Sequence, residues 1–311
     1  MTGATTSALL EALGPQSASD SLASQRARFH QSWFRASVLK VEYGASRSTR
    51  GRLSGAVLDE LSGAAGLNFV DTVTHFAFLA RHAEGWGVDP VQTSRHLVSS
   101  QALMFNIFAP LLQRPDHFLE VLSLACGRSD LVELVSFAYE YAPSNRGDYL
   151  NDMTRIDAIA RVRTTTASET IAFEVKYVDR FNSRVLDLHA NPNYEMLQRT
   201  RRCWRDVELV CAVPRLNQLT RVHALAASIA AQHGDERLTL IGLHRSADVN
   251  AGSILREYGS HATDTIVPVT IDAWVSAMSA VVGTTASQLA ERYLRYEHSE
   301  ALWREFRGHS A

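Results

Sequence analysis

The chain has 311 residues, 46% of them apolar, and a formal net charge of −2. This length allows one large domain or two ordinary ones with a proper core, and the near-neutral charge excludes a protein that coats DNA with basic surface. No run of 18 apolar residues occurs, so we expect no membrane span and no membrane partner. Three cysteines without CxxC or zinc spacing fit a reducing, cytoplasmic location.

The first part of the chain is predicted to be a tail followed by helices. Residues 1–24 are rich in Ser, Ala and Thr and lack the basic start and apolar centre of a signal peptide, so we expect a flexible tail. Asp89 before Pro90 indicates a helix start, because Asp caps helices and Pro suits the first helical position. We predict helices over residues 24–41, 54–64, 68–83, 89–112 and 115–125.

The middle of the chain changes to the period of β-strands. Apolar residues alternate with polar ones over 134–141, over 154–163 and from 171 onward, which is typical of strands with one buried face. The polar residues 164–169 are interpreted as a hairpin loop between the last two strands. Beyond them we predict helices at residues 194–205, 214–233, 272–282 and 285–306, and short strands at 238–243 and 266–271.

This order of elements predicts an α/β fold in which a mixed sheet is flanked by helices, preceded by a helical N-terminal region. We expect a single domain over residues 25–311. Its parts would be a mostly helical segment (25–130), a core that carries the chemistry (131–245) and a C-terminal strand with helices (246–311).

Lysine is scarce in this chain, with two residues against twenty-nine arginines, and one of the two is Lys176. An ammonium is a compact charge whose pKa can shift, whereas a guanidinium is a wide fork. Glu174 lies two residues earlier on the predicted strand, so both side chains face the same way. Asp157 lies on the neighbouring strand of the predicted hairpin. The set Asp157, Glu174 and Lys176 is therefore our candidate catalytic group.

The chemistry of this set favours a divalent metal. Two carboxylates brought together repel, and a cation that both of them bind relieves the repulsion. Hard oxygen ligands suit Mg²⁺ or Mn²⁺, so Asp157 and Glu174 are the expected metal ligands. Such a metal can activate water for phosphodiester hydrolysis while Lys176 stabilises negative charge. The alternative is an ordinary surface ion pair, because Glu-x-Lys pairs are common.

Two stretches of the chain are locally basic. Residues 26–52 carry seven Lys or Arg against one acid, a net charge of +6, and residues 155–205 carry ten against six, a net of +4. An anionic partner such as double-stranded DNA would fit them, although solvated helix faces remain the alternative. The expected phosphate contacts are Arg199, Arg201, Arg202 and Arg205.

Four further segments accompany the candidate catalytic group, at residues 96–102, 105–111, 137–141 and 218–226. Together with Asp157…Glu174-x-Lys176 they resemble the PD-(D/E)XK nuclease superfamily and, more specifically, a restriction endonuclease family within it. The resemblance implies a restriction-endonuclease-like core with the order αβββαβ. Ile156 stands where the name of the motif has proline.

The resemblance also implies roles for residues outside the motif. Glu140 would complete the metal site or orient a water, and Gln218 would lie near the phosphate as part of the catalytic machinery. Gln101 and Asn106 are amides on an apolar helix, and such amides more often satisfy buried backbone groups.

We therefore expect a cytoplasmic, Mg²⁺- or Mn²⁺-dependent endonuclease of restriction or defence type that acts on double-stranded DNA, with a homodimer as an open alternative. Two other functions stay open: a catalytically silent nuclease fold that binds nucleic acid or a protein, and a repair or RNA-directed nuclease. No HExxH or GxSxG motif occurs, and Gly85-Trp86-Gly87 lacks the context of a phosphate loop.

Overall fold

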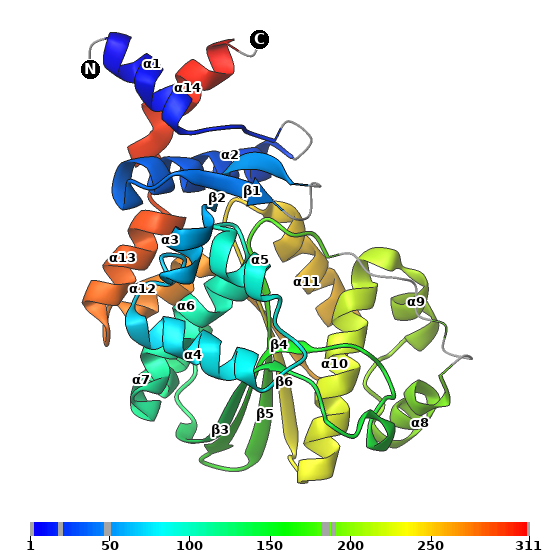
Figure 1. Ribbon diagram of the computed structural model, residues 1–311. Coiled ribbons are helices and arrows are strands. Elements are labelled where there is room, and N and C mark those ends of the chain that lie inside the picture. Colours follow the sequence, from blue (N-terminus) through cyan, green and yellow to red (C-terminus); the bar gives the residue numbers. More distant parts are fainter. Residues whose placement is uncertain (1–2, 18–20, 47–50, 182–186, 188–190, 310–311) are drawn as a thin grey trace. The chain divides into compact units, whose positions relative to one another are not determined.

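The computed structural model describes residues 3–17, 21–46, 51–181, 187 and 191–309 (Figure 1). The described residues group into two compact units. The first is drawn from residues 1–84, 88–110 and 282–311, and the second from residues 85–87 and 111–281. The expected single domain over residues 25–311 stays a prediction.

The first unit is mostly helical and includes a pair of antiparallel strands, β1 and β2. Its elements in chain order are α1 (Gly3–Ala12), α2 (Leu22–Trp33), the π-helix η1 (Phe34–Leu39), β1 (Tyr43–Ser46), β2 (Arg52–Leu58), α3 (Glu60–Ala64), α4 (Thr72–Ala83), α5 (Pro90–Arg95), α6 (Ser100–Leu112, whose last two residues group with the second unit), α13 (Gly283–Tyr293), the 3₁₀-helix η4 (Tyr296–Ser299) and α14 (Glu300–His309).

Helix α1 lies within the stretch that we expected to be a flexible tail. Leu13, directly after it, is buried and packs with Phe29 and Leu302 in a small apolar cluster. The partners of Leu13 come from α2 and α14, far along the chain, so the local sequence gave no sign of this packing.

The helix predicted over residues 54–64 is wrong in its first half, where β2 lies. Residues 56–58 of this strand are buried, and a short buried strand cannot be told from a buried helix by its apolar pattern alone. The helix α3 begins only after Asp59, whose carboxylate accepts the backbone N–H of Ser62 at 3.0 Å. This is the ordinary capping bond of a helix N-terminus.

The helix predicted over residues 89–112 is divided into α5 and α6. His96 adopts extended backbone and forms an isolated antiparallel bridge with Val57 at the end of β2. Asp89 caps α5 as expected and accepts the backbone N–H of Gln92 at 2.9 Å. The pairing with a distant strand therefore overrides a local sequence that favours one continuous helix.

The second unit is built on a mixed sheet whose described strands lie in the order β3-β4-β5-β6-β7. Neighbours are antiparallel from β3 to β5 and parallel from β5 to β7. The elements are α7 (Pro115–Cys126), β3 (Leu131–Tyr141), the 3₁₀-helix η3 (Arg146–Asp148), β4 (Ile156–Thr164), β5 (Ser168–Lys176), α8 (Pro192–Arg201), α9 (Val207–Ala212), α10 (Pro214–His233), β6 (Arg237–His244), α11 (Val249–His261), β7 (Thr265–Thr270) and α12 (Ile271–Met278).

Helices cover both faces of this sheet. Phe173 of β5 points to one face, where its ring contacts Phe118 of α7 and Trp274 of α12 at centroid distances of 6.2 and 5.9 Å. Ala172 points to the other face and belongs to a large apolar cluster with α10 and α11, which run along the sheet in Figure 1. The unit is thus the mixed α/β fold, flanked by helices, that the sequence predicted.

Two helices of the second unit were missed by the sequence analysis. Helix α9 has only six residues, too few for a clear helical period. Helix α11 carries two glycines, Gly252 and Gly259, which weaken its helical signal. The predicted helix at 194–205 ends earlier, at Arg201, because Arg202 takes the left-handed conformation with φ of 54°. None of the helices in the described part of the chain is both long and apolar enough to span a membrane.

Candidate active site

The candidate catalytic residues come together where β4 begins and β5 ends. Lys176 Nζ lies 2.6 Å from Glu174 Oε1, since both side chains point to the α10 face of β5. The ladder between β4 and β5 pairs Ala158 with Phe173, so its register places Asp157 opposite Glu174. Asp157 Oδ2 accepts the backbone N–H of Val175 at 2.7 Å. The hairpin therefore brings all three residues of the predicted set to one place.

The charges at this site strongly affect Asp157. Removal from water raises the pKa of its carboxyl well above the usual value, and the carboxylates of Glu174 and Glu140 raise it further. The Lys176 ammonium and the Val175 N–H act in the opposite direction and are outweighed. The site thus stores unfavourable negative charge that a cation would relieve.

Lys176 keeps its proton despite being only 7% exposed. Burial lowers the pKa of its amine, but the carboxylates of Glu174 and Asp157 together raise it above the usual value. Its ammonium also lies 5.5 Å from the centre of the Phe181 ring. Lys176 is consequently a fixed positive charge at neutral pH, suited to stabilising an anion and unsuited to acting as a base.

Gln218 is placed on α10 so that it contacts the predicted group directly. Its Nε2 donates a hydrogen bond of 2.5 Å to Glu174 Oε1, the same oxygen that Lys176 contacts. Pro214 starts α10 at its first position, and Gln218 follows one turn later. An amide and an ammonium therefore fix the orientation of Glu174 from two sides.

Glu140 lies on β3, and its neighbours Tyr139 and Tyr141 pair with Ala158 and Ile156. The register thus aligns Glu140 with Asp157 across the strand pair. Glu140 is buried and has a positive φ of 43°, a backbone conformation that costs about 1–3 kcal/mol for a residue other than glycine. Strain of this kind is often maintained at functional sites.

Arg155 forms an ion pair with Glu140, at 3.4 Å between its Nε and Oε2. The sequence analysis gave Arg155 no role, although it lies two residues before Asp157 and so faces the same side. Within the described ranges, no three His, Cys, Asp or Glu side chains are arranged to hold a metal ion. Glu140 is thus aligned with Asp157 but balanced by an arginine, and the ligand pair consists of Asp157 and Glu174.

The four arginines expected to contact phosphate differ in their surroundings. Arg201 pairs with Asp264 at 3.6 Å, and Arg205 donates to the carbonyls of Ser260 and Ala262. Their partners lie between α11 and the start of β7, at the edge of the sheet away from Lys176. Two of the four remain exposed to solvent, namely Arg199 and Arg202.

The other basic stretch, 26–52, makes internal contacts at two of its arginines. Arg26 bonds Ser299 at 2.8 Å, and the buried Arg35 donates to Gly55 O at 2.9 Å. Arg47 and Arg50 lie outside the described residues. The amides Gln101 and Asn106 also serve the fold: they accept hydrogen bonds from Thr93 Oγ1 and from the N–H of Val70, each at 2.8 Å.

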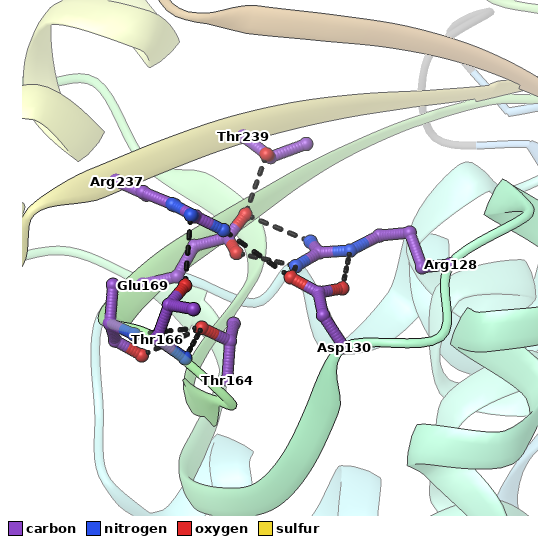
Figure 2. A network of polar contacts seen from close by, with 8 residues as sticks. Arg128, Asp130, Thr164, Thr166, Glu169, Arg237 and Thr239 are labelled. Atoms are coloured by element: carbon purple, nitrogen blue, oxygen red, sulfur yellow. Dashed lines mark hydrogen bonds and ion pairs between the residues drawn. The ribbon is translucent and has the colours of Figure 1, made fainter.

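A second polar network lies at the opposite edge of the sheet, where β5 and β6 begin (Figure 2). The buried Glu169 binds Arg128 through both carboxylate oxygens, at 2.9 and 2.7 Å, and accepts Thr239 Oγ1 at 2.6 Å. Arg237 contacts Asp130 at 3.3 Å. A cleft of about 490 Å³ lies beside this network. The arginines here already bind acids, so the chemistry of the two edges, rather than cleft size, identifies the active site.

Comparison with known families agrees with this geometry. A family model of the PD-(D/E)XK nuclease superfamily matches residues 18–295, nearly the whole chain. The chain belongs to the PD-(D/E)XK nuclease superfamily. Neither the curated proteins nor the solved structures gave a match. The fold of this nuclease-superfamily member is therefore the one that its motif implied, and the carboxylates and lysine of the motif lie together at the end of the hairpin.

Proposed function

We propose that this chain is a metal-dependent endonuclease of restriction or defence type that hydrolyses phosphodiester bonds in double-stranded DNA. The observation that carries the proposal is the convergence of Asp157, Glu174 and Lys176 at the end of the β4–β5 hairpin. Membership of the nuclease superfamily supports the reaction class.

The ligand pair fits a hard divalent cation such as Mg²⁺ or Mn²⁺. Asp157 and Glu174 supply carboxylate oxygens, and the raised pKa of Asp157 reports negative charge that needs compensation. When bound, such an ion would lower the pKa of a water molecule and neutralise charge on the phosphate. Lys176 would hold the anionic phosphate through its ammonium, and Gln218 would keep Glu174 in place.

The test is cleavage of a matched panel of duplex DNA, single-stranded DNA and RNA with Mg²⁺, Mn²⁺, Ca²⁺ or excess chelator. We expect duplex DNA to be cut with Mg²⁺ or Mn²⁺ and to stay intact with chelator. Undiminished cleavage in chelator would contradict the metal site. Cleavage of RNA alone would favour an RNA-directed nuclease, and binding without any cleavage a silent nuclease fold.

Gln218→Ala should lower the cleavage rate by about tenfold and leave the fold unchanged. The reason is that residues orienting a metal ligand typically change activity by about 10–100-fold when removed. Gln218→Glu should be worse, because a carboxylate facing Glu174 Oε1 at 2.5 Å adds repulsion. Initial rates on duplex DNA measure both. Gln232→Ala, further along the same helix, is the control, and equal rates for Gln218→Ala and Gln232→Ala would remove Gln218 from the site.

Replacing Arg199 and Arg202 together with glutamine should weaken DNA binding equally for all sequences. Phosphate contacts carry no base information, and each one lost should flatten the log–log salt dependence by about 0.9. Affinity measured over a series of salt concentrations tests this. Arg304→Gln, an arginine whose side chain is 78% exposed on α14, is the control. An unchanged slope would assign Arg199 and Arg202 to solvation of α8 and the turn after it.

A further inference from the structure

Trp86 is a large aromatic residue left half exposed beside two arginines. Residues 85–87 group with the second unit although they follow α4 in the chain. The Trp86 side chain is 49% exposed. The guanidinium carbon of Arg146 lies 4.2 Å from the centre of a Trp86 ring, and that of Arg155 lies 4.8 Å from it. Both distances are within the range of cation–π attraction.

This Trp86 group borders the candidate active site. Arg155, which contacts the Trp86 ring, also forms the 3.4 Å ion pair with Glu140. The charge of Glu140 in turn acts on the carboxyl of Asp157. One arginine side chain therefore connects the aromatic ring to the row of carboxylates.

The backbone around Trp86 presents the ring to its surroundings. Gly85 and Gly87 both have positive φ, at 99° and 136°, values that other residues rarely adopt. An aromatic residue that served packing alone would bury more of its apolar surface, since burial is what stabilises it. An accessible tryptophan with arginines beside it has the composition that proteins use to stack unpaired bases and hold the adjoining phosphates.

We propose that Trp86 stacks on an unpaired base of the substrate strand while the Arg146 guanidinium binds a neighbouring phosphate. The inference rests on the proposed nuclease function and adds the form of nucleic acid that the site takes. In duplex DNA an unpaired base is available at a mismatch, at a single-stranded junction or after flipping out of the stack. The enzyme therefore acts beside a nucleotide that is not paired.

The test is equilibrium binding in excess chelator, where no cleavage occurs, of three labelled oligonucleotides: an intact duplex, the same duplex with one unpaired nucleotide, and a single strand. Trp86→Ala should lose about tenfold in affinity for the last two, as stacking on an aromatic side chain implies, and little for the intact duplex. Trp86→Phe should keep most of the affinity. Phe76→Ala, which removes an aromatic residue 67% exposed on α4, is the matched control.

Two outcomes would overturn the proposal. Equal affinities of Trp86→Ala and Phe76→Ala for all three oligonucleotides would remove Trp86 from binding. An equal loss on the intact duplex would mean that the ring only holds the arginines. Arg146→Gln keeps the ring and should weaken all three complexes alike, so it tests the phosphate contact even if Trp86→Ala unfolds. Binding in chelator is independent of cleavage, and hence a failure of the nuclease proposal and a failure of base stacking are separately visible.

Discussion

Lys176→Met should lower the rate of DNA cleavage by about 10²–10³-fold, the loss expected when one fixed charge that stabilises an anionic transition state is removed. Burial and two carboxylates hold this ammonium in place with its proton on. Methionine preserves the length and packing of the side chain but carries no charge. Lys176→Arg should also fail, because the wide guanidinium cannot occupy the position 2.6 Å from Glu174 Oε1 without displacing Gln218.

The matched control is Lys40→Met, at the other lysine of the sequence, which is exposed at the end of η1. Single-turnover rates at saturating enzyme separate the chemical step from binding. Comparable rates for Lys176→Met and Lys40→Met would sink the assignment of Lys176 to catalysis. If Lys176→Met kept its rate and lost only affinity, Lys176 would bind the phosphate equally in the ground and transition states.

Asp157→Asn should raise the free energy of unfolding of the metal-free protein at neutral pH while abolishing cleavage. The folded state raises the pKa of Asp157, so its ionisation at neutral pH destabilises the fold by about 1.4 kcal/mol for each unit of that rise. Asparagine carries no charge and can still accept the Val175 N–H. The stability gap between variant and wild type should open as pH rises above the ordinary value of 3.8 and become constant above the folded pKa.

Added Mg²⁺ should reverse the order of stability, because only the wild type retains both carboxylates that bind the ion, and binding to the folded state stabilises it. Thermal unfolding over a pH series, with chelator or with Mg²⁺, measures both effects. Glu133→Asn, an exposed acid on β3 paired with Arg163, is the control. A wild type more stable than Asp157→Asn in chelator at neutral pH would show that Asp157 is not a source of repulsion.

Much of the second unit could be predicted because its strands follow a strict period. Alternation from residue 171 puts Glu174 and Lys176 on one face of β5, and the hairpin loop before it fixes β4 as the neighbour. The position of Asp157 opposite Glu174 follows from that register. Short-range patterns therefore carried the three catalytic candidates, since each depends on strand period and one local turn.

Features that depend on distant contacts could not be predicted. The left-handed backbone of Glu140 has no signal in a sequence where glycine or asparagine would be expected. The ion pair of Arg155 with Glu140 joins two strands across a connection of irregular length. Trp86 reaches the second unit from a segment between two helices of the first. In each case the partner is set by tertiary packing, which local propensity does not encode.

The polar network at the base of the sheet has a bearing on how this protein tolerates change. Glu169, clamped by Arg128 and Thr239, and the turn closed by Thr164 together hold the two strands in register about 17 Å from Glu174. A slip of one residue there would turn every side chain of β5 to the opposite face. The hairpin tip is thus an alignment device, and a single insertion in it could silence the enzyme with every catalytic residue still present.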